Sequence, residues 1–181
     1  MKIYKILLPF CMALLLFACK EDKIAEDGPM DNGISTFYFI RHAEKDRMDP
    51  DNPDPELNQK GLGRAMHWAE ILDNVPLGAI YTTDYERTQM TAAPAAVKQD
   101  LVVQYYSLED LSIEQFKTDN LNSNVLVVGH ANTIPEFVNL MIGEDKYGPM
   151  DEYDNGSLYI VQLVNGTATD MQLEFNCNCP D

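Results

Sequence analysis

The chain has 181 residues, 45% of them hydrophobic, and a formal net charge of −16 at pH 7. A chain of this length and composition can form one domain with a buried core, but it is too short for two domains. The acidic balance argues against nucleic acid and anionic lipid surfaces as partners, because both require basic patches. A group of arginines and histidines inside such a chain would therefore stand out.

Residues 1–18 have the pattern of an export signal. Lys2 and Lys5 precede an apolar run, residues 6–17, that is too short to span a bilayer comfortably. The sequence Ala18-Cys19 resembles the processing site of bacterial lipoproteins, in which the cysteine carries the lipid. We expect cleavage before Cys19 and lipidation of that residue, with an ordinary secretory signal as the alternative.

Residues 19–33 are rich in Asp, Glu, Gly and Pro, and their composition predicts a flexible tether. Lys20-Glu21-Asp22 is similar to a tag that places some lipoproteins of Gram-negative bacteria on the outer surface. We expect an exported protein, held at the outer membrane or the cell surface by its lipid anchor alone. Loss of residues 1–18, which include two lysines and no acids, changes the formal charge to −18.

The domain is expected to span residues 34–176 and to begin with a buried strand, residues 34–40. A loop dense in Asp and Pro, residues 49–55, follows it. Asn58 is a suitable cap for a helix over residues 59–72, in which apolar residues recur on one face. The domain thus opens with a strand, a loop and a helix.

The middle of the chain repeats the alternation of strand and helix. Residues 79–82 predict a strand, and Asp84 is expected to cap a helix in which Pro94 lies near the end or at a kink. Residues 101–105 predict a third strand, and Ser112 begins another helix with the spacing of a capping box. Glu109 and Asp110 would lie in the loop between that strand and that helix.

The last part of the domain changes pattern. A strand over residues 125–128 and a helix over residues 133–142 are followed by two strand-like runs, residues 158–164 and 167–175, around the hairpin signal Asn165-Gly166. These elements predict an α/β fold: a mostly parallel sheet, helices on both faces in three layers, and a C-terminal antiparallel hairpin. In the tail, residues 177–181, Cys177 and Cys179 either form a disulfide or stay free.

Four side chains that can donate hydrogen bonds or carry positive charge are expected at one edge of this sheet. Arg41 and His42 follow the first strand, His130 follows the strand over 125–128, and Arg87 lies one turn into a helix. Ligands of such sheets bind beyond the carboxyl ends of the strands. Arginine suits a phosphoryl group because its planar fork donates two parallel hydrogen bonds, and an imidazole can act as nucleophile. The site predicts phosphoryl chemistry without a metal or any other cofactor, on a small phosphorylated substrate.

The motifs that carry this site occur in the order found in a known family: Arg41-His42-Ala43-Glu44-Lys45, Leu57-Asn58 with Gly61, residues 83–92, and Val128-Gly129-His130-Ala131-Asn132. On these motifs the chain resembles the histidine phosphatase superfamily, in its compact, phosphoglycerate mutase-like branch 1. The resemblance spans most of the domain. It implies that His42 is the nucleophile and forms a phosphohistidine, and that Arg41, Arg87 and His130 bind the phosphate.

A general acid must protonate the leaving oxygen and later activate water. We select Glu109, which follows the third strand as the acid does in one branch of the family; Asp110, Asp151 and Glu152 are the alternatives. Each of these could equally be a solvated loop carboxylate. Lys45 and Asn132 are candidates for substrate binding, although Lys45 could instead form an exposed ion pair and Asn132 could cap a helix.

The function expected from these residues is that of a metal-independent phosphatase, a phosphoric monoester hydrolase similar to histidine acid phosphatases. Three other functions stay open. Two are enzymatic, the removal of phosphate from phosphohistidine and a mutase-like phosphotransfer. The third is a surface lipoprotein that binds an anion or a partner without catalysis.

Overall fold

The computed structural model describes residues 33–177 and residue 179. The predicted signal over residues 1–18, the lipidation of Cys19 and nearly all of the predicted tether lie outside these residues. Within the described part of the chain, no helix is both long enough and apolar enough to cross a membrane.

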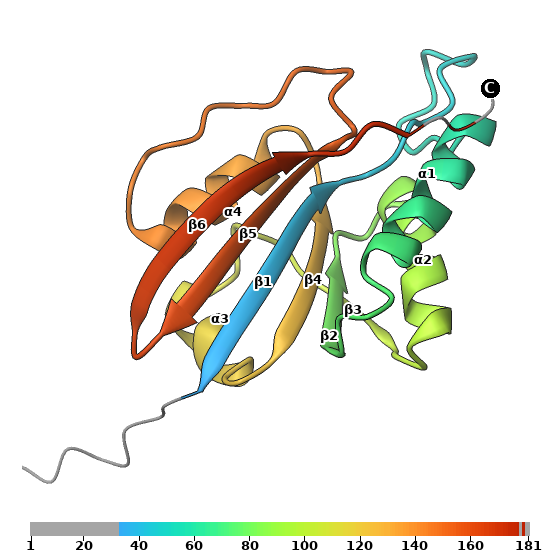
Figure 1. Ribbon diagram of the computed structural model, residues 1–181. Coiled ribbons are helices and arrows are strands. Elements are labelled where there is room, and N and C mark those ends of the chain that lie inside the picture. The colour runs from blue at the N-terminus through green and yellow to red at the C-terminus, as the bar shows by residue number, and fades with distance from the viewer. Residues whose placement is uncertain (1–32, 178, 180–181) are drawn as a thin grey trace, which may run out of the picture. The chain divides into compact units, whose positions relative to one another are not determined.

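The domain is built on a six-stranded mixed sheet in the order β3-β2-β4-β1-β5-β6. Four strands run parallel: β1 (Ile34–Arg41), β4 (Asn124–Gly129), β2 (Leu77–Thr82) and, at one edge, β3 (Val103–Tyr105). Strands β5 (Ser157–Val164) and β6 (Thr167–Glu174) form an antiparallel hairpin that pairs with β1 (Figure 1). The predicted fold class is therefore confirmed, although β3 begins two residues later than expected.

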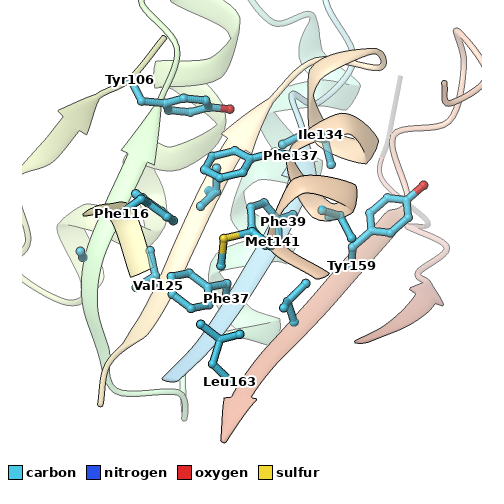
Figure 2. Packing of buried hydrophobic residues seen from close by; sticks show 14 residues of the cluster. Phe37, Phe39, Tyr106, Phe116, Val125, Ile134, Phe137, Met141, Tyr159 and Leu163 are labelled. Atoms are coloured by element: carbon cyan, nitrogen blue, oxygen red, sulfur yellow. The ribbon is translucent and has the colours of Figure 1, made fainter. Parts of the chain in front are cut away.

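Helices cover both faces of the sheet, because alternate residues of the central strands point to opposite sides. Phe37 and Phe39 pack against Phe116 of α3 (Ile113–Asp119) and Phe137 of α4 (Thr133–Ile142), as Figure 2 shows. On the other face, Ile40 belongs to a second core with residues of α1 (Gln59–Ile71) and α2 (Glu86–Lys98). These two cores hold the three layers together.

The pairing of β1 with β4 brings the two histidine-bearing strand ends side by side. The register sets Arg41 opposite Gly129, and the backbone N–H of His42 continues the ladder by donating to the carbonyl of Gly129 at 2.9 Å. A side chain at Gly129 would clash with neighbours of this strand end, since a Cβ there would lie 2.6 Å from the hydroxyl of Tyr106. The glycine of the Gly129-His130 motif thus allows close packing beneath the second histidine.

Two of the three predicted helix caps are confirmed, and one is wrong. Asn58 accepts a hydrogen bond from the N–H of Gly61 at 2.9 Å, and Ser112 accepts one from Gln115 at 3.3 Å. Asp84 does not cap α2, because the N-cap position is Tyr85, one residue after Asp84. The free N–H of Glu86 donates instead to the carboxylate of Asp54, from the loop rich in proline. Pro94 lies inside α2.

The chain beyond β6 returns to α1. The carbonyl of Phe175 accepts a hydrogen bond from Arg64 at 3.3 Å, and the ring of Phe175 lies edge-on to buried Trp68. A disulfide joins Cys177 and Cys179. The end of the domain is thereby held against the helical layer that also supports the strand end of His42.

Candidate active site

A cavity of about 700 Å³ opens beyond the carboxyl ends of the parallel strands. Its lining includes all seven of the residues predicted for catalysis or substrate binding: Arg41, His42, Lys45, Arg87, Glu109, His130 and Asn132. The structure thus brings the residues selected from the sequence together around one cavity. The geometry determines what each side chain is able to do there.

The imidazole of His42 is fixed with one nitrogen available. Its Nδ1 lies 2.7 Å from the carbonyl oxygen of Ala43. A carbonyl only accepts hydrogen bonds, so Nδ1 carries the proton and donates it. In the neutral ring, the lone pair is then on Nε2. His42 therefore has the tautomer that a nucleophile attacking through Nε2 requires.

The backbone around His42 is held by two side chains that the sequence analysis did not select. The amide of Asn155 donates to the carbonyl of His42 at 2.8 Å. Thr91 accepts from the N–H of Ala43 at 2.9 Å and donates to the carbonyl of Arg87 at 2.6 Å. Thr91 thus ties the segment of His42 to the helix that carries Arg87. It lies in the family motif, whereas no sequence pattern marks Asn155.

Glu44 supports the same segment from behind. Its carboxylate forms a half-buried ion pair with Arg64 of α1, with a shortest distance of 2.8 Å, and it does not line the cavity. Burial raises the pKa of Glu44, but the hydrogen bonds from Arg64 outweigh this effect and leave the pKa below its usual value. Glu44 therefore anchors the strand end to α1 as a carboxylate.

His130 faces His42 across the cavity, with the two ring centroids 5.5 Å apart. Its Nε2 lies 2.9 Å from the hydroxyl of Thr83, and its backbone N–H donates to the hydroxyl of Thr133 at 3.1 Å. The ring of Tyr85 packs edge-on against it at a centroid distance of 5.0 Å. These contacts fix the ring beside the expected position of a phosphoryl group.

Arg41 binds the backbone of a distant segment and also lines the cavity. Its side chain is buried, and Nη1 donates to the carbonyls of Asp151, Glu152 and Asp154 at 2.9, 2.7 and 3.2 Å. This arrangement holds the segment before β5 across the edge of the site. The buried Nε of Arg41 has no hydrogen-bond partner among the described residues. An anion in the cavity would supply an acceptor for the guanidinium.

Arg87 has a similar arrangement on the opposite side. Its Nη1 donates to Asp54 at 3.0 Å, and its guanidinium lies 4.3 Å from the ring centroid of Tyr85. Among the residues that the structure describes, its buried Nε also lacks a partner. Both arginines thus combine contacts to the protein with donors that are still free. Such a pair is suited to bind the oxygens of a phosphoryl group.

Both imidazoles are neutral at physiological pH. The pKa of His42 is lowered to about 3, first by burial and then by the charges of Arg41, His130 and Arg87, against the opposing effect of the Ala43 carbonyl. Burial and the two arginines lower the pKa of His130 to about 4. Burial and nearby Arg87 also lower the pKa of Lys45. These shifts arise first from burial and then from the neighbouring cationic side chains.

We expect a histidine titration to reveal these shifts directly. Carbon-13 NMR of the imidazole rings should show His42 and His130 neutral from about pH 7.5 to about pH 5, because their pKa values of about 3 and about 4 lie below the ordinary value of about 6.5. Either ring titrating near pH 6.5 would contradict the cationic, desolvated cavity.

The same shifts make stability depend on pH. Between about pH 6.5 and the lower folded-state values, the unfolded chain binds protons that the folded protein excludes. The free energy of unfolding therefore has its full value above about pH 6.5 and decreases as the pH falls. The decrease is at most about 1.4 kcal/mol per pH unit for each of the two histidines, and urea unfolding at several pH values measures it.

The candidate acids differ in position. Glu109 is exposed and lines the cavity, whereas Asp110 and Asp151 do not line it. Glu152 lines it but pairs with Arg47 at 2.5 Å, and this partner lowers its pKa. A carboxylate that favours its charged form is a poor proton donor. Of the four candidates, Glu109 alone both lines the cavity and has no ion-pair partner among the described residues.

A second cavity, of about 640 Å³, lies along α4 and meets the first at Asn132. Its lining contains Glu136, Glu144 and Asp145 and no arginine, lysine or histidine. A phosphate dianion would be repelled there, so the first cavity is the better candidate for a phosphoryl site. Asn132 itself occupies the N-cap position of α4 without a side-chain capping bond, which leaves its amide free for other contacts.

No cluster of three or more His, Cys, Asp or Glu side chains among residues 33–177 and 179 is placed to hold a metal ion. The expected independence from metals is still a prediction. An activity assay with and without a chelator tests this prediction.

Comparison with known proteins shows which sequences and folds this chain is similar to. Residues 37–112 match the sequence model of the histidine phosphatase superfamily (branch 1), a segment that includes Arg41, His42, Arg87 and Glu109. No curated protein matches the sequence.

Solved structures show the same fold at low identity. The protein histidine phosphatase SixA, complexed with tungstate, has a TM-score of 0.59 and 14% identity over 77% of this chain and 96% of its own. Phosphoglycerate mutase from Bacillus anthracis str. Sterne has a TM-score of 0.56 and 15% identity over 80% and 94%. A mycobacterial glucosyl-3-phosphoglycerate phosphatase has a TM-score of 0.54 and 15% identity over 80% and 100%. The segment of residues 37–112 is thus similar to the histidine phosphatase superfamily (branch 1), and the chain shares the fold of these solved structures.

Proposed function

We propose that this protein is a metal-independent phosphatase that hydrolyses a phosphomonoester through a phosphohistidine on His42. One observation carries the proposal. The neutral His42 donates from Nδ1 to Ala43, and so keeps the Nε2 lone pair, in a cavity lined by two arginines with free donors. A nucleophile and a set of anion-binding donors are thereby combined in one site.

The first step transfers the phosphoryl group to the enzyme. Nε2 of His42 forms a bond to phosphorus while the bond from phosphorus to the leaving oxygen breaks. That oxygen takes a proton from Glu109 and departs as an alcohol. Arg41, Arg87 and His130 bind the equatorial oxygens, and their donors stabilise the charge that develops there.

The second step releases phosphate. Glu109, now a carboxylate, accepts a proton from water as the water oxygen attacks phosphorus. The bond from phosphorus to Nε2 breaks, inorganic phosphate leaves, and His42 returns to its starting tautomer. Lys45 and Asn132 line the outer part of the cavity, where they would contact the substrate.

Phosphohistidine is the second candidate substrate. The protein histidine phosphatase SixA has the same fold, and an imidazole leaving group depends less on a proton donor than an alkoxide does. A mutase is less well supported. Only the short strand β3 and the seven-residue helix α3 separate α2 from β4, so no long segment is available there to shield an intermediate from water. The role of a non-catalytic anion-binding lipoprotein does not require the nucleophilic tautomer of His42.

The cellular setting proposed from the sequence is export followed by lipid anchoring through Cys19. A phosphatase in this setting would act outside the cytoplasm, at the outer membrane or on the cell surface. Mass spectrometry of the mature N-terminus tests this part separately.

An assay with p-nitrophenyl phosphate and a panel of phosphorylated metabolites, with and without EDTA, tests the proposed reaction. We expect turnover that EDTA leaves unchanged, because the proposed steps use protein side chains alone. A Glu109→Gln variant should lose about 10²-fold on alkyl phosphates, whose leaving oxygen needs a proton, and much less on p-nitrophenyl phosphate.

The outcomes separate the parts of the proposal. No turnover on any substrate would contradict the phosphatase function. Loss of activity in EDTA would contradict the metal-free mechanism. An undiminished Glu109→Gln variant would remove Glu109 as the acid while leaving His42 as the nucleophile.

A further inference from the structure

Asp54 lies behind Arg87, on the side away from the phosphoryl site. Its Oδ1 accepts from Nη1 of Arg87 at 3.0 Å. Arg87 lines the active-site cavity, whereas Asp54 lines a separate hollow in the Asp- and Pro-rich loop. Asp54 thus binds Arg87 from the loop without itself lining the active-site cavity.

A second contact fixes the plane of the same group. The ring of Tyr85 covers one face of the Arg87 guanidinium at 4.3 Å, and Tyr85 is in turn packed against His130. One contact on the edge and one on the face determine both the position and the tilt of the guanidinium. The free Nε of Arg87 then has a defined direction.

Asp54 is itself held in place before any ligand arrives. Both of its carboxylate oxygens accept from the backbone N–H of Glu86 at 3.1 Å, at the start of α2, where the helix end favours negative charge. The loop that carries Asp54 is closed at its base, because the N–H of Asp46 donates to the carbonyl of Glu56 at 2.7 Å and Lys45 forms a bridge with Leu57.

We propose that Asp54 is a positioning residue, which sets the plane of the Arg87 guanidinium for the phosphoryl group. This role rests on the proposed function. Arginine has many rotamers, and the freedom it would lose on binding an anion is already lost when Asp54 and Tyr85 hold it. The carboxylate also repels a dianion, but its side chain is 36% exposed and its charge is screened by solvent and by Arg87 itself. Orientation is therefore the larger effect.

A double-mutant cycle on tungstate binding by the full chain tests this role, with calorimetry as the measurement. We expect Asp54→Asn to weaken tungstate binding about 10-fold and to lower kcat/KM for p-nitrophenyl phosphate by a similar factor. The amide retains the size of the side chain but loses the negative charge and one of the two acceptor oxygens, so it holds the guanidinium less firmly. In the Arg87→Ala background, the same substitution should have no further effect.

Asp51→Asn is the matched control, because it neutralises an exposed carboxylate in the same loop. The carboxylate that contacts Arg87 is that of Asp54, not that of Asp51. The control variant should leave tungstate binding unchanged. An equal loss from Asp54→Asn in both backgrounds would reveal a general structural role, and tighter binding would show that charge repulsion dominates; either result overturns the proposal. Failure of the unsubstituted protein to bind tungstate would instead contradict the phosphate site itself, and with it this role.

Discussion

Substitution of His42 by alanine should abolish turnover, with a loss of about 10⁴-fold or more in kcat. The variant loses the only group that the proposed reaction uses to form a bond to phosphorus. The folded structure should persist, because the backbone N–H and carbonyl of His42 still bind Gly129 and Asn155. Steady-state kinetics with p-nitrophenyl phosphate, together with circular dichroism, measures both effects.

His67→Ala provides the matched control, since His67 is the third histidine of the chain and lies on α1 outside the cavity. This variant should retain the turnover of the unsubstituted protein. A His42→Ala variant that keeps more than about a tenth of the activity would rule out His42 as the nucleophile.

Substitution of Arg41 by alanine should damage both catalysis and stability. Arg41 as a whole residue is 4% exposed. Its Nη1 donates to three carbonyls of the segment before β5. Without it those carbonyls lose their donor, and the site loses one of its two arginines. We expect a loss of about 10²- to 10³-fold in kcat/KM and of about 2–4 kcal/mol in the free energy of unfolding.

Arg47→Ala is the comparison for this effect, because Arg47 contacts the same segment from its exposed side. Its side chain is 40% exposed and pairs with Glu152, which is itself exposed. Exposed ion pairs contribute little, so the loss in stability should stay below about 1 kcal/mol. Urea unfolding and kinetics compare the two variants. If Arg41→Ala lost no more stability and no more kcat/KM than Arg47→Ala, Arg41 would be neither an anchor of this segment nor an anion ligand.

The fold was predictable because its signals are local. The apolar runs of β1 and β4 are nearly continuous, as expected of strands buried on both faces. Asn165-Gly166 is a typical hairpin turn, and it joins β5 and β6. Parallel strands separated by helices then place Arg41, His42 and His130 at one edge. The sequence could not show the order of the strands, which depends on packing between distant segments.

The supporting contacts of the site were less predictable, because they join loops. Asp84 lies one residue too early to cap α2, and the carboxylate of Asp54 takes that role from 32 residues before Glu86. Asn155 reaches His42 from 113 residues away. Neither Asp54 nor Asn155 belongs to a repeating pattern. The path of its loop determines whether each side chain reaches the segment that it binds. The residues that line the cavity were therefore recognised, and those that hold them were not.

The tautomer of His42 links the fold to the proposed chemistry. The ladder bond to Gly129 and the amide of Asn155 fix the backbone, and the Ala43 carbonyl then accepts from Nδ1. The same backbone geometry that ends β1 thus selects the reactive nitrogen. A phosphoryl group on this ring should be attached to Nε2 and not to Nδ1.

Trapping of this intermediate is the most direct test of the account. The protein is mixed with a phosphate ester, denatured in alkali within a fraction of a turnover, and analysed by mass spectrometry and phosphorus-31 NMR. We predict one acid-labile phosphoryl group on Nε2 of His42, present in the unsubstituted protein and absent from His42→Ala. Efficient turnover with no phosphoryl group on His42, or with one on a different residue, would contradict the proposed mechanism.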